Sequence, residues 1–321
     1  MIDGDAIVIE KLLVRYRGKP AVNGLTLTVP KGSVFALLGE NGAGKSTTMK
    51  VLTGLVQPHS GHAEILGLNC WSRAYELRHR VGYVPEKPRF YDWMTVAEIG
   101  WFTASFHRTG FGELYSAWVE KLALDPSKRM KEMSKGGYAR VGLALALAAD
   151  PQVLLLDEPT SGLDLLTRRE FLSSLVELAA EGRTILISSH SISELERFAS
   201  HAAFVQDGVV TLAAPLDDLR KNFRRVEFRA SGTIPDLSSI GKVLQTQRVG
   251  KFMQVLLQNP DPDALGLFLN REDLTDAEEA AVNLEDVYAA LMAKADTRRK
   301  PSPLRLRTGE ELENELYEEG V

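Results

Sequence analysis

The sequence predicts an α/β fold, in which a large domain built on a parallel sheet is followed by a smaller second domain. Three segments, SVFALLG, PQVLLLD and RTILISSH, are short runs rich in apolar residues, as expected for buried parallel strands. Segments with helical spacing separate them. The first run is followed at once by glycines and by the helix-like segment KSTTMKVLTGL, which is the order of a strand and its crossover helix.

Other parts of the first domain carry different patterns. Residues 6–29 alternate short β-like runs with turn residues, which predicts an antiparallel hairpin sheet at the start. Residues 93–148 are expected to form a mostly helical insertion. The segment HAAFVQDGVVTL predicts a hairpin that turns at Asp207 and Gly208. We therefore expect the first domain to span residues 1–221.

A small α+β domain is predicted over residues 222–295. VEFRA, KVLQTQ and FMQVLLQ resemble short strands, and residues 284–295 resemble a terminal helix. Residues 296–321 are basic up to Arg307 and acidic afterwards, with few apolar positions, which predicts a disordered tail. The basic stretch either touches anionic lipid at a membrane surface or remains solvated.

The composition indicates a soluble globular protein. Of the 321 residues, 44% are hydrophobic and 25% are charged, and the net charge of -5 gives no general attraction to nucleic acid. The single cysteine, Cys70, excludes an internal disulfide framework and a cysteine-rich metal cluster, which favours a reducing cytosol. We expect no export signal and no membrane-spanning run. If the protein acts at a membrane, another subunit must cross it.

The segment GENGAGKST matches the phosphate-binding spacing G-x-x-x-x-G-K-[ST]. It lies between a buried strand and a helix, so backbone amides can curl around phosphate oxygens while the helix start adds its positive dipole end. Lys45 is expected to hold the β and γ phosphates of ATP, and Ser46 to offer its hydroxyl to Mg²⁺. The alternative is a glycine-rich turn without a ligand. The predicted ATP-binding residues of this segment are Gly39, Glu40, Asn41, Gly42, Ala43, Gly44, Lys45, Ser46 and Thr47.

The segment LLLDEP places two acids at the carboxyl end of a buried strand, where ligands bind in open α/β sheets. Asp157 fits the role of holding Mg²⁺ through water. Glu158 is then available to orient or deprotonate the water that attacks the γ-phosphate. The alternative is an acid pair that caps the next helix.

Together with the segments that follow, these motifs resemble the ATPase cassettes of ABC proteins. SGLD directly follows the acid pair, and His190 ends the next strand in ISSH. The resemblance implies a P-loop NTPase of ABC type, with His190 contacting the γ-phosphate and Asp164 in the loop that meets a second subunit. It also implies that Tyr16 stacks on adenine. Taken alone, His190 and Tyr16 could be ordinary strand residues.

The sequence departs from the family pattern in two places. The run MSKGGYAR is similar to the LSGGQ signature, which reaches across a dimer to the partner's nucleotide; Ser134 and Gly136 keep their places, and Lys135 replaces a glycine. Lys135 either adds a cation near the triphosphate, hinders close approach, or is solvated. In VGYVPEKP, Glu86 replaces the usual glutamine, which retains an oxygen for Mg²⁺ or water but adds repulsion toward phosphate. Single-cassette exporters of drugs and peptide antibiotics often carry similar substitutions, so the resemblance implies that both departures are features of that subgroup.

The resemblance therefore implies the ATP-binding and hydrolysing subunit of an ABC transporter, with export favoured. Its cofactors would be ATP and Mg²⁺. Its partners would be a second cassette, in a homodimer or heterodimer, and integral membrane permease subunits, with the chain peripheral at the cytoplasmic face of the membrane. Aromatic residues of the insertion form either a docking groove for the permease or a core: Trp93, Trp101, Phe102 and Phe106.

Two other functions remain as alternatives. One is a soluble ABC ATPase that acts on nucleic acid or ribosomes, and the other is an ATP-dependent regulatory module that does not hydrolyse. The first is disfavoured because each motif occurs once and no cysteine metal motif is present. The second is disfavoured because Glu158 and His190 are both present. The transported substrate cannot be predicted from this chain.

Overall fold

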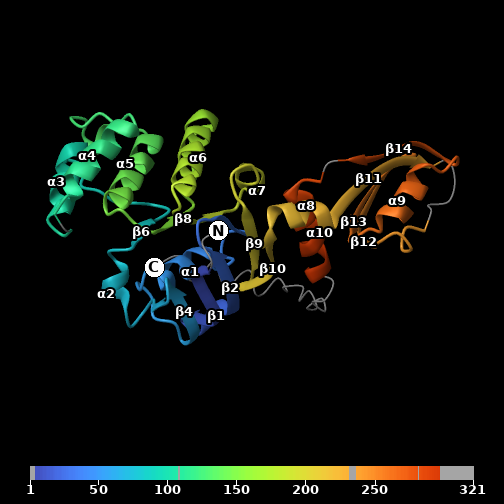
Figure 1. Cartoon of the computed structure of the whole chain (residues 1–321), viewed down its shortest axis with the longest axis horizontal. Helices are drawn as coiled ribbons and strands as arrows, with labels where there is room; N and C mark the ends of the chain where they lie inside the picture. Colours follow the sequence, from blue (N-terminus) through green and yellow to red (C-terminus); the bar gives the residue numbers. More distant parts are fainter. Residues whose placement is uncertain (1–3, 108, 231–235, 281, 297–321) are drawn as a thin grey trace, which may run out of the picture. The chain divides into compact units, whose positions relative to one another are not determined.

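The computed structural model describes residues 4–107, 109–230, 236–280 and 282–296. The described residues fall into two compact units, one up to residue 222 and the other from residue 223 onward (Figure 1). The charged tail predicted over residues 296–321 lies, apart from its first residue, outside the described residues.

The first unit begins with an antiparallel sheet in the order β2-β1-β4-β5. Strands β1 (Asp5–Tyr16) and β2 (Lys19–Pro30) form the predicted hairpin, which turns through Arg17 and Gly18, both with positive φ angles. Strands β4 (Ser60–Ile65) and β5 (Leu68–Asn69) extend the sheet and were not predicted.

The second sheet of this unit carries the strand ends on which the site is built. Its order is β10-β9-β3-β8-β7-β6. Strands β3 (Val34–Leu38), β7 (Val153–Asp157) and β8 (Thr184–Ser189) are parallel and wholly buried, which confirms the three predicted strands. Strand β6 (Val81–Val84) pairs in parallel with β7, and β9 (His201–Gln206) pairs in parallel with β3.

Strand β10 (Val209–Pro215) returns antiparallel to β9 and completes the predicted hairpin. Asp207 and Gly208, at its turn, have φ angles of 51° and 77°. Two successive left-handed residues are typical of the two-residue turns that match the twist of a hairpin, and aspartate followed by glycine adopts them readily. This part of the sequence prediction is confirmed.

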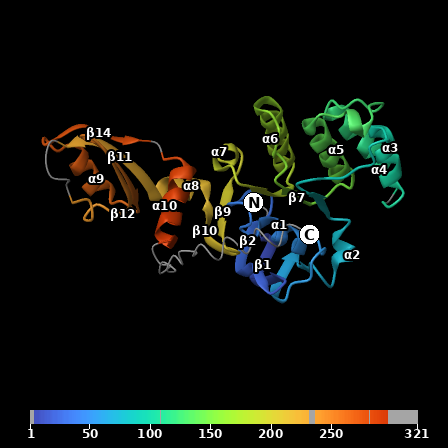
Figure 2. The ribbon, with the colours of Figure 1, turned by 180° about the vertical axis from the view of Figure 1, so that it is seen from behind.

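The helices of the first unit connect and cover the two sheets. Helix α1 (Lys45–Leu52) follows β3 and lies beside the antiparallel sheet (Figure 2). Its buried Met49 and Leu52 share one core with Ile7 of β1 and Leu37 of β3. Helix α6 (Leu165–Ala180) is the crossover from β7 to β8. The shorter helices are α2 (Ala74–Leu77), α7 (Ile192–Leu195) and α8 (Leu216–Asn222).

In the segment predicted to be a helical insertion, the described residues form three α-helices between β6 and β7. These are α3 (Val96–Ala104), α4 (Phe111–Lys121) and α5 (Lys135–Ala148), preceded at α5 by a short 3-10 turn. They lie side by side in Figure 1 and bury a core of their own, separate from that of the sheets. No helix in the described ranges is both long and apolar enough to cross a membrane.

The described residues of the second unit form a four-stranded antiparallel sheet in the order β12-β13-β11-β14 and two helices. Strands β11 (Phe223–Ala230), β12 (Lys242–Val249) and β13 (Phe252–Gln258) match the three predicted strands, and α10 (Leu284–Asp296) matches the predicted helix. Helix α9 (Pro262–Leu269) and strand β14 (Leu274–Ala280) were not predicted. Phe268 of α9 packs edge-on against Phe228 of β11, with ring centroids 5.3 Å apart.

Candidate active site

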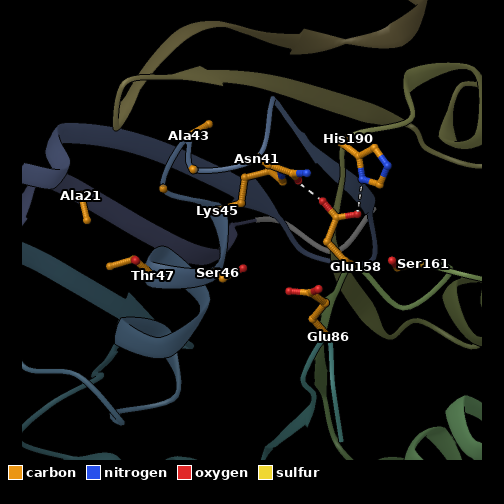
Figure 3. Close-up of a pocket in the computed structure, with 12 residues that line it drawn as sticks. Ala21, Asn41, Ala43, Lys45, Ser46, Thr47, Glu86, Glu158, Ser161 and His190 are labelled. Carbon is orange, nitrogen blue, oxygen red and sulfur yellow. Dashed lines mark hydrogen bonds and ion pairs between the residues drawn. The ribbon is translucent and has the colours of Figure 1, made fainter. Parts of the chain in front are cut away.

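A cavity of about 400 Å³ lies at the carboxyl ends of the buried parallel strands (Figure 3). Its walls come from the loop after β3, the start of α1, the loop after β6, and the ends of β7 and β8, with one residue from β2. Ligands bind at this edge of an open parallel sheet because the strand ends and helix starts meet there. The lining residues are Ala21, Asn41, Gly42, Ala43, Gly44, Lys45, Ser46, Thr47, Glu86, Glu158, Ser161 and His190.

The loop between β3 and α1 is shaped by glycines. Gly42 and Gly44 have φ angles of 85° and 107°, in the left-handed region that favours glycine. A Cβ atom added at Gly44 would also lie 2.5 Å from the carbonyl oxygen of Ala21, so a side chain there would collide with the backbone of β2. Among the described residues, no side chain caps the start of α1. The first-turn amides and the positive end of the helix dipole are therefore available to an anion.

Lys45, the first residue of α1, is only 5% exposed. Its Nζ atom donates to the carbonyl oxygens of Gly39 and Glu40, at 2.6 and 3.1 Å, and lies 3.1 Å from Oε1 of Glu158. The Glu158 contact is an ion pair whose angles are not those of a hydrogen bond. The ammonium is thus held at the cavity wall by oxygens alone.

Asp157 ends β7 and is 2% exposed. Its Oδ1 atom accepts hydrogen bonds from the hydroxyls of Ser46, at 3.0 Å, and Ser188, at 2.7 Å. Burial raises the pKa of Asp157, the two serine hydrogen bonds oppose that shift, and the neighbouring charges of Glu158 and Glu86 add to it. The site therefore holds an acid that is costly to ionise without a cation nearby.

Glu158 follows Asp157 and has a φ angle of 46°, in the left-handed region. A residue other than glycine pays about 1–3 kcal/mol for such a conformation, and observed strain of this kind is frequent at functional sites. The Glu158 carboxylate lies between two partners. Its Oε1 atom faces Lys45, and its Oε2 atom lies 2.8 Å from Nδ1 of His190. Figure 3 shows this chain of contacts across the cavity. The backbone N–H of Glu158 donates to Ser188 Oγ at 2.9 Å.

The donor atoms fit a magnesium ion. The Ser46 hydroxyl and the Asp157 carboxylate meet in one place, and Glu86 lines the same cavity. Within the described part of the chain, no group of three or more His, Cys, Asp or Glu side chains could hold a metal. Magnesium is usually held by one or two protein oxygens, waters and substrate phosphates, so this small oxygen set suits it.

Not all of the predicted site residues lie at this cavity. Gly39 and Glu40 contribute through their carbonyl contacts with Lys45, and Asp157 through Ser46. Tyr16 lies at the end of β1, is 47% exposed, and is not among the lining residues.

Three predicted residues, Ser134, Gly136 and Asp164, lie at the starts of helices and do not line the cavity. Ser134 caps α5 by accepting from the N–H of Gly137 at 3.1 Å, and Gly136 is buried in the first turn of that helix. Asp164 caps α6 by accepting from the N–H of Thr167 at 3.0 Å. The structure does not bring Ser134, Gly136 or Asp164 into the cavity of their own chain.

Sequence reasoning missed Ser188, although this hydroxyl joins the two acids. Asp157 and Ser188 are paired neighbours in the register of β7 and β8, and the hydroxyl both donates to the Asp157 side chain and accepts from the Glu158 backbone. The only sequence signal was a serine near the end of an apolar strand. Its role became visible once the strand register was known.

Comparison with known proteins identifies the family. A protein-family model described as "ABC transporter" matches residues 22–161 of the chain. A second family model, described as "AAA domain, putative AbiEii toxin, Type IV TA system", matches residues 132–196. The chain is 33% identical to a bacitracin transport ATP-binding protein of Enterococcus faecalis over 314 residues, covering 91% of this chain and 98% of that one. It is 35% identical to a fluoroquinolones export ATP-binding protein of Mycobacterium tuberculosis, covering 71% and 78%.

An uncharacterized ABC transporter ATP-binding protein of Nostoc sp. is 38% identical, over 62% of this chain and 61% of that relative. Among solved structures, a subunit of an ABC transporter complex of Clostridium perfringens matches with a TM-score of 0.61 and 28% identity, covering 68% of this chain and 91% of that one. A dimeric ATP-binding cassette, described as a post-hydrolysis state bound to ADP and Pi, has the same fold at a TM-score of 0.60 and 21% identity, covering 65% and 98%. With this fold, this cavity and these relatives, the chain belongs to the ATP-binding subunits of ABC transporters, the family of ABC ATPase cassettes.

Proposed function

We propose that this subunit binds Mg²⁺-ATP and uses its hydrolysis to drive export of a substrate through separate membrane permease subunits. The observation that carries the proposal is the position of Glu158, whose carboxylate lies between Lys45 and His190 beside the Ser46–Asp157 contact. One cavity thus holds an ammonium to bind phosphate, oxygens for a metal and a carboxylate to act on water. A passive binding module has no need for the third group.

The loop from Gly39 to Thr47 is proposed to bind the triphosphate. Gly42, Gly44 and Lys45 line the cavity, and the proposal is that their amides and the ammonium of Lys45 donate to the phosphates. Asn41, Ala43 and Thr47 complete the wall. Tyr16, half exposed on β1, remains the proposed surface for the adenine ring.

Ser46, Asp157 and Glu86 are proposed to hold the magnesium ion. When bound, the ion would neutralise charge on the phosphates. The protein's part is to present oxygens: Ser188 fixes one oxygen of Asp157, and the same oxygen accepts from Ser46. An ion here would also offset the charge of buried Asp157.

Glu158 is proposed to be the general base, with His190 orienting it. With the proton on Nδ1, the imidazole of His190 donates to Oε2 of Glu158 and fixes the direction of the carboxylate. Glu158 can then accept a proton from water that lies between it and the terminal phosphate. Positioned general bases typically contribute about 10²–10⁴-fold to a rate.

A second cassette is proposed to complete the site. Ser134 and Gly136 begin α5 and Asp164 begins α6, and none of them lines the cavity of its own chain. Ser134 and Asp164 are exposed, so they are accessible to a facing copy. The dimeric cassettes among the similar solved structures support this arrangement. Either a homodimer or a heterodimer would satisfy it.

A membrane partner is proposed to dock on the helical insertion, which would place this chain at the cytoplasmic face of the membrane. Trp93, Trp101 and Phe106 are 65%, 74% and 71% exposed, so they are not core residues. Phe102 is 39% exposed and packs edge-on against Phe106, with ring centroids 5.4 Å apart. Several exposed aromatic side chains on one helical segment are a common feature of protein interaction sites. The relatives named for bacitracin transport and fluoroquinolone export support an antibiotic-like cargo.

The test is to co-express this chain with membrane proteins encoded near its own gene and to purify any complex that forms into lipid vesicles. We expect the two chains to co-purify and the complex to hydrolyse ATP in the presence of Mg²⁺. A complex that contains Glu158→Gln is the matched control, which should assemble without hydrolysing. Recovery of the chain only with ribosomes or DNA, or the absence of ATP binding and hydrolysis with the permease present, would overturn the proposal.

A further inference from the structure

The hydroxyl of Tyr83, on β6, is buried and has no hydrogen-bond partner among the described residues. A buried hydroxyl without a partner is unfavourable, and native proteins contain few of them. The hydroxyl of Tyr115, by contrast, is buried in the helical insertion and donates to the carbonyl oxygen of Val96 at 2.8 Å. The Tyr83 hydroxyl is therefore an unused donor that calls for an explanation.

The strand register places Tyr83 beside the acids of the site. Strands β6 and β7 are parallel, and Tyr83 is the partner of Leu155. Side chains alternate along a strand, so Leu155 and Asp157 project from one face, and Tyr83 projects from that same face on the neighbouring strand. Burial, followed by the charges of Asp157 and Glu86, raises the pKa of Tyr83, so both carboxylates act on this hydroxyl.

Among the described residues, Glu86 is the acid of this cavity for which no buried partner is found. Glu158 is held by Lys45 and His190, and Asp157 is held by two serine hydroxyls. The carboxylate of Glu86 has, within the described ranges, an ion pair at 3.4 Å with its neighbour Lys87, which is 84% exposed and holds it only weakly. Figure 3 shows the Glu86 carboxylate directed toward the same space as Ser46 and Glu158.

We infer that Tyr83 is a positioning residue for the metal end of the site: its hydroxyl donates a hydrogen bond to the Glu86 carboxylate when Mg²⁺-ATP is bound. This contact would hold Glu86 beside Asp157, where its oxygen faces the metal instead of Lys87. It gives the buried hydroxyl a partner and gives the exposed carboxylate a fixed direction. The inference rests on the proposed Mg²⁺-ATP site and adds a residue that does not line the cavity.

The experiment compares the full-length chain with its Tyr83→Phe variant. A fluorescent, non-hydrolysable ATP analogue is titrated at a series of Mg²⁺ concentrations, and the Mg²⁺ concentration for half-maximal binding is recorded. We expect this midpoint to rise about 3–10-fold, the range that corresponds to loss of one hydrogen bond. Binding of the analogue without Mg²⁺ should be unchanged. The Tm without nucleotide should stay the same or rise, because an unpaired buried hydroxyl has been removed.

Two further variants identify the partner of the hydroxyl. In a Glu86→Ala background, Tyr83→Phe should produce no additional change in the Mg²⁺ midpoint, because the proposed acceptor is already absent. Tyr115→Phe is the matched control: it removes a hydroxyl that has a partner, so it should lower the Tm and leave the Mg²⁺ midpoint unchanged.

The outcomes separate this inference from the proposed function. If the unmodified chain shows Mg²⁺-dependent binding and Tyr83→Phe has the same midpoint, the inference is wrong and the site stands. If Tyr83→Phe shifts the midpoint equally with and without Glu86, the hydroxyl acts through another group, and the inference is again wrong. If the unmodified chain shows no Mg²⁺-dependent binding at all, the proposed function itself fails.

Discussion

Oε1 of Glu158 lies 3.1 Å from Nζ of Lys45, and the two side chains are 8% and 5% exposed. The lysine is the first residue of α1 and the glutamate directly follows β7, so this contact joins two walls of the cavity. A phosphate group that approaches the ammonium must compete with the carboxylate. The ion pair therefore links three properties: the affinity for nucleotide, the stability of the unliganded chain and the ability of Glu158 to accept a proton. Each property can be tested separately.

Replacement of Glu158 by glutamine should separate binding from turnover. The amide has the size of the carboxylate but cannot accept a proton, so we expect hydrolysis to fall at least about 100-fold, within the range typical of general bases. The amide also carries no charge to neutralise Lys45, so the ammonium is free to attract phosphate. We therefore expect the variant to bind ATP at least as tightly as the unmodified chain does. Phosphate release and equilibrium titration measure the two effects. The control is Glu10→Gln, at an exposed position on β1, which should change neither property. Undiminished phosphate release from Glu158→Gln would refute the assignment of Glu158 as the general base.

Lys45→Ala should weaken nucleotide binding and also destabilise the unliganded chain. The change leaves the buried Glu158 carboxylate without its counter-charge, and loss of one partner of a buried ion pair typically costs on the order of 3 kcal/mol. Chemical denaturation measures the loss. Lys50→Ala, at an exposed position later in α1, should have little effect on either property.

The double variant of Lys45→Ala with Glu158→Gln tests this explanation. Since the second change removes the unpaired charge, the double variant should be more stable than Lys45→Ala alone, even though it carries one more substitution. Two losses that simply add would mean that the side chains are energetically independent despite their distance.

Asp157→Asn should stabilise the unliganded chain at neutral pH. Burial raises the pKa of Asp157 above its usual value of 3.8. A carboxyl whose pKa is raised on folding contributes stability below its unfolded pKa, and that contribution is lost as the pH rises through the folded pKa. The asparagine variant keeps the oxygen that accepts from Ser46 and Ser188 and avoids the buried charge. Its Tm advantage should therefore be present near neutral pH and shrink as the pH falls toward the usual pKa of the carboxyl.

Asp125→Asn provides a control of opposite sign. Hydrogen bonds from Ser127 lower the pKa of this exposed carboxyl, so its charged form favours folding, and its removal should not raise the Tm at neutral pH. Mg²⁺-dependent nucleotide binding should fall in Asp157→Asn and be unchanged in Asp125→Asn. A Tm difference between Asp157→Asn and the unmodified chain that does not depend on pH would contradict the assigned cause.

Much of the fold could be predicted because its signals are local. The wholly buried strands β3, β7 and β8 are short runs rich in apolar residues, and the turn at Asp207 and Gly208 has its own residue preference. Strand β4 was missed because SGHAEI buries only Ala63 and Ile65. Helix α9 was missed although a start signal was present: Asp261 caps it and Pro262 is its first residue.

The candidate site divides in the same way. The phosphate loop and the acid pair are short motifs, and the chemistry of their residues can be read without a structure. The contacts of Ser188 and the position of Tyr83 depend on the register between strands that are about 30 and 70 residues apart in the sequence, which no local pattern determines. The hydrogen bond between His190 and Glu158 likewise joins two strand ends that only the sheet order makes neighbours.

The close approach of α5 and α6 gives a last prediction. A Cβ atom at Gly136 would lie 2.5 Å from Cγ2 of Thr167, so in Gly136→Ala either the Thr167 side chain or the start of one helix must shift. We expect it to cost about 1–3 kcal/mol in unfolding free energy, the range for overpacking, and to lower hydrolysis because Ser134 and Asp164 cap these same helices. Thr167→Ser removes Cγ2 but keeps the hydroxyl that donates to Asp164 at 2.7 Å. The double variant should therefore recover both stability and hydrolysis, whereas Gly112→Ala, where a Cβ meets nothing within 4 Å, should be harmless throughout. Failure of Thr167→Ser to rescue Gly136→Ala would show that the glycine is required for a reason other than this contact.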